Sequence, residues 1–304
     1  MIAGARPSVV IIATAGRPDI CAEAVRAIDE AAHSPEVTIR GIVSAPDQKD
    51  APNNLTSRWA LLLGPRGSAA QRNTALDSVG EETEYVFFFD DDAIPRSDYI
   101  VATSRYLEEK PAVLAVTGNV IADGAATGRE IPLVQALQLL DESWETTPGW
   151  NAYPALPSKD LYGCNFAIRW SALRDVRFDE RLPLYSWLED RDYACRAARI
   201  GEIRRLEGAI VVHRGSASGG RTAHRRLGYS QVANPWWLAE KGSFSWRLAA
   251  QQIARPVLKN MILSIVPAKR LAVRRSRLAG NLNAFVDLTV NHGRAQPEKI
   301  LEMS

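Results

Sequence analysis

The sequence Tyr85-Val86-Phe87-Phe88-Phe89-Asp90-Asp91-Asp92 joins five apolar residues directly to three carboxylates. Such a run predicts a buried strand that ends at the edge of a sheet. Open α/β sheets bind their ligands at the carboxyl ends of their strands. Asp90 and Asp92, separated by one residue, can point the same way and suit a hard divalent cation that also bridges substrate phosphates. The stretch therefore predicts a metal site at the carboxyl edge of a sheet.

An acidic surface turn is the alternative explanation of this run. Three adjacent carboxylates repel one another, however, and placing them directly after Phe87-Phe88-Phe89 costs stability unless a cation offsets the repulsion. We therefore favour a metal site over a chance turn.

Apolar runs that alternate with helical patterns extend on both sides of this strand. Buried strands interleaved with helices are typical of a parallel sheet covered on both faces, so we predict an α/β fold. The predicted strands cover residues 8–13, 37–44, 59–63, 85–89, 113–120, 164–169 and 209–213, and the predicted helices cover 19–32, 71–79, 97–107 and 188–200. Turns and Trp residues break the periodicity of residues 123–159, where no elements are predicted.

Composition and charge restrict the class of protein. The chain has 304 residues, 46% hydrophobic and 24% charged, so it can bury a sizeable core. Its net charge of +2 provides no overall field to attract nucleic acid. The three cysteines are far apart and form no Cys-x-x-Cys pair, which argues against disulfides and zinc and favours a reducing, cytoplasmic setting. No stretch reaches the roughly 18 apolar residues that a membrane span needs.

Five further segments carry candidate functional residues in an informative order. They are Ile11–Pro18 at the end of the first strand, Gly67–Leu76 where a loop becomes a helix, Tyr162–Arg169, the acidic helix start Trp187–Arg196, and Val211–Ser216 with a His at a strand end. Together with the Asp-x-Asp run, these segments resemble the inverting family 2 glycosyltransferases. The resemblance covers roughly residues 8 to 215.

The resemblance implies a Rossmann-like nucleotide-diphospho-sugar transferase fold of the GT-A type, with a mixed, mostly parallel sheet. It also implies a divalent metal, Mg²⁺ or Mn²⁺, that is bound together with the donor. On the family's pattern Asp92 would be a metal ligand, and Asp90 would contact the nucleotide ribose or its water shell. Asp91 would also belong to the donor side.

Further donor contacts follow from the same resemblance. Thr14 and Arg17 would lie beside the nucleotide, and Arg72 would lie near it. Asp47 would contact a pyrimidine base, although the two acidic residues and Gly-Ser common in the family are missing there. The alternatives are a turn residue for Asp47 and a salt-bridged helix arginine for Arg72.

The second half of the site is implied by the later segments. Gly163 and Asn165 match a region where the backbone passes under the donor sugar, although Gly163 could equally serve an ordinary turn. Asp190 would be the catalytic base, and Glu189 would support the acceptor or the base; an inverting transfer needs one carboxylate near the acceptor hydroxyl. The helix dipole alone also favours acidic residues at this position. His213 would be a further metal ligand or a structural histidine.

Residues 221–304 differ in character from residues 1–220, which we assign to the catalytic domain. The second part is predicted to be helical, basic and rich in Trp. Its aromatic and basic residues include Trp236, Trp237, Trp246, Arg247, Arg255, Lys259, Lys269, Arg270, Arg274, Arg275 and Arg277. A basic amphipathic helix can lie on an anionic membrane at its inner face. A helical subdomain that packs on the catalytic domain is the alternative.

These observations predict an inverting glycosyltransferase that takes a sugar from a nucleotide-diphosphate donor, UDP or dTDP. The acceptor would be a saccharide or a lipid-linked saccharide in bacterial-type polysaccharide or glycoconjugate synthesis. Two alternatives stay open, a non-catalytic nucleotide-sugar-binding module and a metal-dependent phosphotransferase. A dinucleotide dehydrogenase is excluded because no Gly-x-Gly-x-x-Gly follows a predicted strand.

Overall fold

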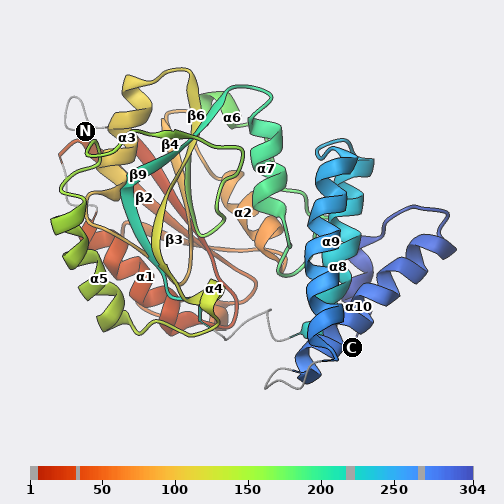
Figure 1. Ribbon diagram of the computed structural model, residues 1–304. Coiled ribbons are helices and arrows are strands. Elements are labelled where there is room, and N and C mark those ends of the chain that lie inside the picture. The colour runs from red at the N-terminus through yellow and green to blue at the C-terminus, as the bar shows by residue number, and fades with distance from the viewer. Residues whose placement is uncertain (1–5, 32–34, 217–222, 266–270, 304) are drawn as a thin grey trace.

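The computed structural model of the chain describes residues 6–31, 35–216, 223–265 and 271–303. Figure 1 shows two parts, a twisted sheet flanked by helices and a group of long helices that stands against one side of it. The predicted boundary between residues 220 and 221 lies outside the described residues. So do Lys269 and Arg270 of the predicted basic segment.

Nine strands form one sheet in the order β3-β2-β1-β4-β8-β6-β9-β5, with β7 beside β9. Their bounds are β1 (Arg6–Ala13), β2 (Val37–Ala45), β3 (Trp59–Leu63), β4 (Tyr85–Asp90), β5 (Ala93–Pro95), β6 (Val113–Asp123), β7 (Leu156–Pro157), β8 (Asn165–Arg169) and β9 (Glu202–His213). Strands β1 to β4, β6 and β9 run in one direction, whereas β5, β7 and β8 run against it. The predicted mixed, mostly parallel sheet is confirmed.

Helices cover both faces of this sheet (Figure 1). One side carries α1 (Pro18–Ala31), α3 (Tyr99–Glu109) and α5 (Leu133–Thr146), and the other carries α2 (Ser68–Leu76), α6 (Trp170–Leu173) and α7 (Glu189–Ala197). The 3-10 helix η1 (Gln48–Asp50) follows β2, and the short helix α4 (Gly124–Thr127) follows β6.

The continuous apolar run of β4 is explained by this double cover. Successive side chains of a strand point to opposite faces. Phe87 and Phe89 therefore join the core under α1 and α3, while Val86 and Phe88 join the core under α2 and α7. A strand buried on both faces has no solvent side on which a polar residue would be favoured.

The structure differs from the sequence expectations, or adds to them, in four places. The segment predicted as a strand at 164–169 runs antiparallel, because it is inserted between β4 and β6. The strand predicted at 113–120 continues to Asp123, and the last strand begins at Glu202 rather than at 209. Residues 123–159, for which no elements were predicted, contain α4, α5 and β7.

The parallel strands end at the same edge of the sheet, and this positions the candidate functional residues. Thr14 follows β1, Asp90 ends β4, Asp123 ends β6 and His213 ends β9. Four residues distant in sequence are thereby brought to one edge, where ligands bind in open α/β sheets.

The C-terminal part consists of α8 (His224–Glu240), α9 (Trp246–Leu263), α10 (Leu271–Val290) and the 3-10 helix η3 (Pro297–Leu301). It has its own apolar core, which includes Tyr229, Val232 and Leu288. It also packs on the part that contains the sheet, since Lys241 forms ion pairs with Asp179 and Asp192. Within the described ranges, no helix is long and apolar enough to cross a bilayer.

Candidate active site

A cavity of about 1210 Å³ lies at the carboxyl edge of the sheet. It reaches the helical part, because Arg226 and Arg277 complete its wall. The predicted site residues that line it are Thr14, Arg17, Arg72, Asp90, Asp92, Gly163, Glu189, Asp190 and His213. Nine predicted residues from six segments of the chain are thus brought together.

Asp90, Asp92 and His213 form a group that fits a metal ion. One potential ligand atom from each of the three lies within 4.8 Å of the others. Nε2 of His213 lies 3.2 Å from Oδ1 of Asp92 and 3.8 Å from Oδ2 of Asp90. This buried nitrogen makes no hydrogen bond. A neutral imidazole nitrogen and two carboxylate oxygens around one point are a donor set that suits Mn²⁺ or Mg²⁺.

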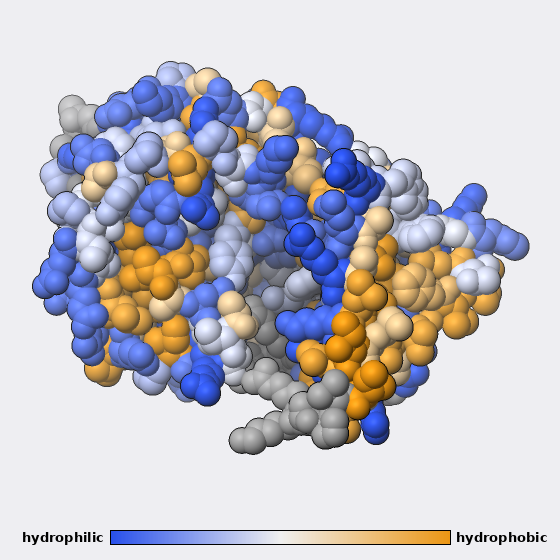
Figure 2. All heavy atoms as spheres, viewed as in Figure 1, coloured by the Kyte–Doolittle hydropathy of each residue, from blue (hydrophilic) through white to orange (hydrophobic). Residues whose placement is uncertain are grey.

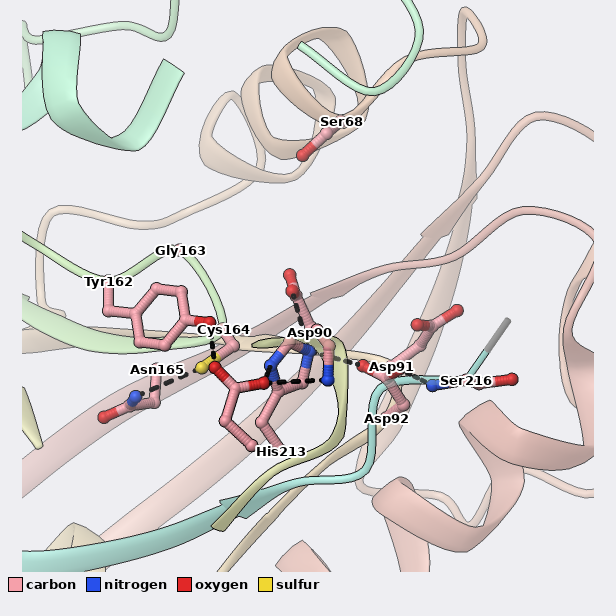
Figure 3. Close-up of polar contacts among 12 residues, drawn as sticks. Ser68, Asp90, Asp91, Asp92, Tyr162, Gly163, Cys164, Asn165, His213 and Ser216 are labelled. Carbon is pink, nitrogen blue, oxygen red and sulfur yellow. Dashed lines mark hydrogen bonds and ion pairs between the residues drawn. The ribbon is translucent and has the colours of Figure 1, made fainter. Parts of the chain in front are cut away.

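Asp123, which was not among the residues predicted from the sequence, orients the imidazole of His213. Its Oδ1 lies 3.0 Å from Nδ1 of His213, and its Oδ2 accepts a hydrogen bond of 2.5 Å from the Tyr162 hydroxyl. Figure 3 shows Asp90 and Asp92 on one side of His213 and Tyr162 on the other. A carboxylate behind a ligating histidine fixes the ring and its tautomer.

The raised pKa of His213 indicates that the surrounding carboxylates stabilise a positive charge at this position. Burial by itself lowers the pKa of this imidazole, but the hydrogen bond to Asp123 and the negative charges of Asp92 and Asp90 outweigh it and raise the pKa to about 10. Either a proton or a metal ion can satisfy these carboxylates. A metal ion would replace the proton on Nε2, because only a neutral imidazole nitrogen can ligate.

Asp91 pairs with the guanidinium of Arg17 and does not line the cavity. It is fully buried, accepts a hydrogen bond of 2.7 Å from Thr14 and pairs with Arg17. Arg17 also reaches Oδ2 of Asp92 at 3.3 Å. The middle carboxylate of the run thus fixes Arg17 at the rim of the cavity.

Arg72 links the two halves of the site. It is 2% exposed and donates to Asp90 at 3.0 Å, to Glu189 at 2.8 Å and to the Gly163 carbonyl at 2.8 Å. Buried arginines need such partners, because an unpaired buried charge is costly. Its guanidinium donates to all of these groups, and it thereby fixes the distance between the carboxylate at the end of β4 and the one at the start of α7.

Asp190 presents a carboxyl to the cavity from the first turn of α7. Its Oδ2 accepts a hydrogen bond of 2.9 Å from the Gly163 amide, and its Oδ1 accepts one of 2.7 Å from the Arg191 amide. A Cβ at Gly163 would lie 3.0 Å from Oδ2, so this close approach favours glycine. Burial raises the pKa of Asp190 above its ordinary value. Such a shift makes a carboxylate a stronger base.

The backbone before α7 is strained. Leu184, Ser186 and Leu188 all have positive φ, between 49° and 75°, which is uncommon for residues other than glycine. Strain of this kind clusters at functional sites, where the surrounding structure holds it in place. Here it sets the direction in which Glu189 and Asp190 enter the cavity.

Comparison with solved structures identifies the fold. The mannosyltransferase PcManGT from Pyrobaculum calidifontis, in complex with GDP-Man and Mn²⁺, aligns with a TM-score of 0.51 and 16% identity over 94% of this chain and 89% of that one. The chain has a GT-A-type glycosyltransferase fold. S. aureus TarS, residues 1–349, aligns with a TM-score of 0.49 and 13% identity over 94% of this chain and 74% of that one, too distantly to support an inference. No protein-family model and no curated protein matches the sequence.

Besides Asp91, two further predicted donor residues, Asp47 and Asn165, do not line the cavity of this GT-A fold. Asp47 caps η1 by accepting a hydrogen bond of 3.1 Å from the Lys49 amide, and its side chain is 53% exposed. Asn165 is fully buried and accepts hydrogen bonds from the Tyr99 hydroxyl at 2.9 Å and the Gly118 amide at 2.8 Å. Asn165 therefore joins β8 to β6 rather than facing the donor.

Replacing Asp47 with alanine tests this placement. We expect the affinity for a nucleoside diphosphate to stay within about twofold of wild type, because exposed substitutions away from a site change free energies little. Isothermal calorimetry in Mn²⁺ measures it. A loss of tenfold or more would mean that the nucleotide base extends beyond the cavity as far as η1.

Proposed function

We propose that this protein is an inverting, metal-dependent glycosyltransferase. It moves a sugar from a nucleotide-diphosphate donor, UDP or dTDP, to a saccharide or lipid-linked acceptor in bacterial-type polysaccharide or glycoconjugate synthesis. The observation that carries the proposal is the shared cavity: the Asp90, Asp92 and His213 cluster and the Asp190 carboxyl line the same 1210 Å³ space. The GT-A fold adds to it, since the distant mannosyltransferase contains GDP-Man and Mn²⁺.

Each half of the cavity has a separate role. Asp90, Asp92 and His213 would hold Mg²⁺ or Mn²⁺, which supplies positive charge to the donor diphosphate as it leaves. Asp190 takes the proton of the acceptor hydroxyl, whose oxygen forms a bond to the anomeric carbon. The bond from that carbon to the diphosphate oxygen breaks on the opposite side, so the configuration inverts. Arg72 donates hydrogen bonds to both Asp90 and Glu189 and would hold the two carboxylates in place during this step.

Product analysis separates this function from its alternatives. Wild-type protein is incubated with UDP-, dTDP- and GDP-sugars and Mn²⁺, and water serves as a slow substitute acceptor. A glycosyltransferase cleaves the anomeric carbon–oxygen bond and releases nucleoside diphosphate and free sugar. A phosphotransferase would instead cleave a phosphorus–oxygen bond and give a sugar phosphate or inorganic phosphate. A binding module would give no product, and either of these results would contradict the proposal.

Asp123→Asn tests the support of the metal ligand. We expect the affinity for Mn²⁺ to fall about 10- to 100-fold, because the amide keeps the shape of the carboxylate but removes the charge behind His213. Titration of Mn²⁺ followed by electron paramagnetic resonance measures the free ion. Asp29→Asn is the matched control, since Asp29 accepts from Trp59 away from the cavity. Equal affinities in the two variants would remove Asp123 from the metal site.

We propose further that the protein works in the cytoplasm, peripherally at the inner face of the membrane. Leu258, Ile262 and Ile265 are 54%, 58% and 79% exposed at helical spacing along and just beyond α9. Figure 2 shows apolar residues gathered on the helical part. Trp236 and Trp237, which were predicted in the basic segment, do not belong to this surface. The indole of Trp236 donates a hydrogen bond to the Gly293 carbonyl, and that of Trp237 donates one to the Asp179 carboxylate.

The variant Leu258→Ser/Ile262→Ser/Ile265→Ser should lower co-sedimentation with phosphatidylglycerol vesicles at least about tenfold, since apolar side chains supply much of interfacial binding. A control variant with the same chemical change on the catalytic part should bind like wild type. It carries Leu63→Ser, Val134→Ser and Leu137→Ser, all at exposed positions. Equal vesicle binding by both variants would contradict the membrane contact.

A further inference from the structure

A second cavity of about 720 Å³ lies between the catalytic part and the helical part. Gly124 to Ala126 of α4 and Trp187 form one wall, and α8, α9 and α10 form the other. Figure 2 shows the molecule hollowed between its two parts. This cleft adjoins the candidate active site, because Ala125, Trp187 and Arg277 line both cavities. A molecule that occupies the cleft can therefore reach the sugar-transfer site.

The cleft is strongly basic. Its lining contains Arg255, Lys259, Arg274, Arg277 and His224, and Glu130 is the one acidic side chain among its lining residues. Arg255, Lys259 and Arg274 form no ion pair with any described residue. The pKa of His224 is lowered by burial and then by the nearby charges of Arg277 and Arg274, as expected where positive charge accumulates.

The polar groups of the cleft are held in place by a buried amide network. Asn260 donates to Gln231 and to Asn281, in each case at 2.9 Å, and its Oδ1 accepts a hydrogen bond of 3.1 Å from Arg274. Buried polar networks of this kind cost stability unless every member is satisfied, and they fix the side chains that they bind. Arg274 is thereby positioned at the cleft without an acidic partner. The buried Nε1 of Trp187 also makes no hydrogen bond.

We propose that this cleft binds a phosphate or diphosphate group of the acceptor, through Arg255, Lys259 and Arg274. The inference rests on the proposed function, because it assigns the class of acceptor that the transferase uses. Arginine and lysine are the side chains that recognise phosphate. The donor's own diphosphate is needed beside Asp90 and Asp92 in the first cavity, which leaves the second cavity for the other substrate. Its volume is within the ordinary range for ligand pockets.

The first experiment uses inorganic pyrophosphate as the probe, in metal-free buffer with a chelator. Calorimetry compares wild-type protein with Arg255→Gln/Lys259→Gln/Arg274→Gln. We expect the triple variant to bind pyrophosphate at least about tenfold more weakly, since each charged hydrogen bond lost weakens binding. The double variant Arg255→Gln/Lys259→Gln should show an intermediate loss. It also leaves the Arg274–Asn260 hydrogen bond intact, so disruption of the buried amide network cannot explain its result.

A control variant removes the same charge from exposed positions elsewhere. It carries Lys110→Gln, Arg247→Gln and Arg294→Gln. Its pyrophosphate affinity should stay within about twofold of wild type, whereas a purely non-specific charge effect would weaken both triple variants equally. Equal affinities of the cleft variant and this control, or no binding by wild type, would overturn the proposal.

Two further arms identify the source of the phosphate and separate this proposal from the proposed function. Phosphatidylcholine vesicles with and without farnesyl diphosphate test a lipid-borne group. If the vesicles bind the protein only when they contain farnesyl diphosphate and only when the cleft residues are intact, the acceptor is lipid-linked. If the protein binds pyrophosphate but not these vesicles, the acceptor is soluble. Nucleoside diphosphate binding in Mn²⁺ should be unchanged in the cleft variant. Pyrophosphate binding without any nucleotide binding by wild type would contradict the transferase function and leave the anion site standing.

Discussion

Replacing Asp190 with asparagine is expected to lower the rate of sugar transfer about 10²- to 10⁴-fold, the usual contribution of a general base. The amide oxygen can still accept the hydrogen bond from the Gly163 amide, whereas the one from the Arg191 amide to Oδ1 is lost, so the side chain should stay beside Gly163. It cannot take the proton of the acceptor. The dissociation constant of the nucleoside diphosphate in Mn²⁺ should therefore be unchanged.

The pH dependence provides a second readout of Asp190. A base acts when it is deprotonated, and burial raises the pKa of this carboxyl above 3.8. The rate should fall with decreasing pH through that raised pKa, and this limb should be absent from the residual activity of Asp190→Asn. Asp141→Asn on the exposed face of α5 is the control for the chemical change. Transfer at the wild-type rate in Asp190→Asn would exclude Asp190 as the base. Loss of nucleotide binding together with the loss of transfer would place Asp190 in the donor site.

Asp92→Ala should have the largest effect on metal binding. Burial alone would raise the pKa of Asp92, but His213 and Arg17 hold it below its usual range, so this carboxylate is ionised and available to a metal. Its removal leaves His213 and Asp90 as the described members of the cluster. Even supporting residues behind metal ligands alter affinity 10- to 100-fold, so we expect the affinity for Mn²⁺ to fall at least about 100-fold.

Nucleotide binding and transfer should be lost together in Asp92→Ala, in contrast to Asp190→Asn. Mn²⁺ titration and calorimetry measure the two effects, and thermal unfolding monitors the fold. Asp77→Ala is a suitable control, because Asp77 is exposed and pairs with Arg177 outside the cavity. Wild-type Mn²⁺ affinity in Asp92→Ala would place the metal elsewhere.

The strands of the sheet were predictable because they are buried on both faces. Phe87-Phe88-Phe89 and Val9 to Ile12 have no polar alternation, and burial alone explains their composition. The antiparallel direction of β8 was not predictable. Strand direction depends on which neighbours a strand meets, and β8 is enclosed between two strands distant in sequence.

Which segments line the cavity was predictable, but the direction of each side chain was not. His213 and Asp190 were singled out by their positions at a strand end and a helix start, and both line the cavity. Asp123 was missed because β6 contains register shifts near its end, and the apolar pattern stops before the carboxylate. A polar residue at the end of a long strand, followed by the small residues of α4, was the available signal. Asn165 shows the opposite case, since its motif position matches but its side chain points into the core.

The most direct test is calorimetric titration of UDP, dTDP and GDP into wild-type protein, with Mn²⁺ and with chelator. A metal-dependent nucleotide-sugar transferase should bind at least one of the three in Mn²⁺, lose that binding in chelator, and lose it equally in Asp92→Ala. Binding that is the same with and without metal, or no binding of any of the three, would contradict the assignment of Asp90, Asp92 and His213 as a metal and donor site.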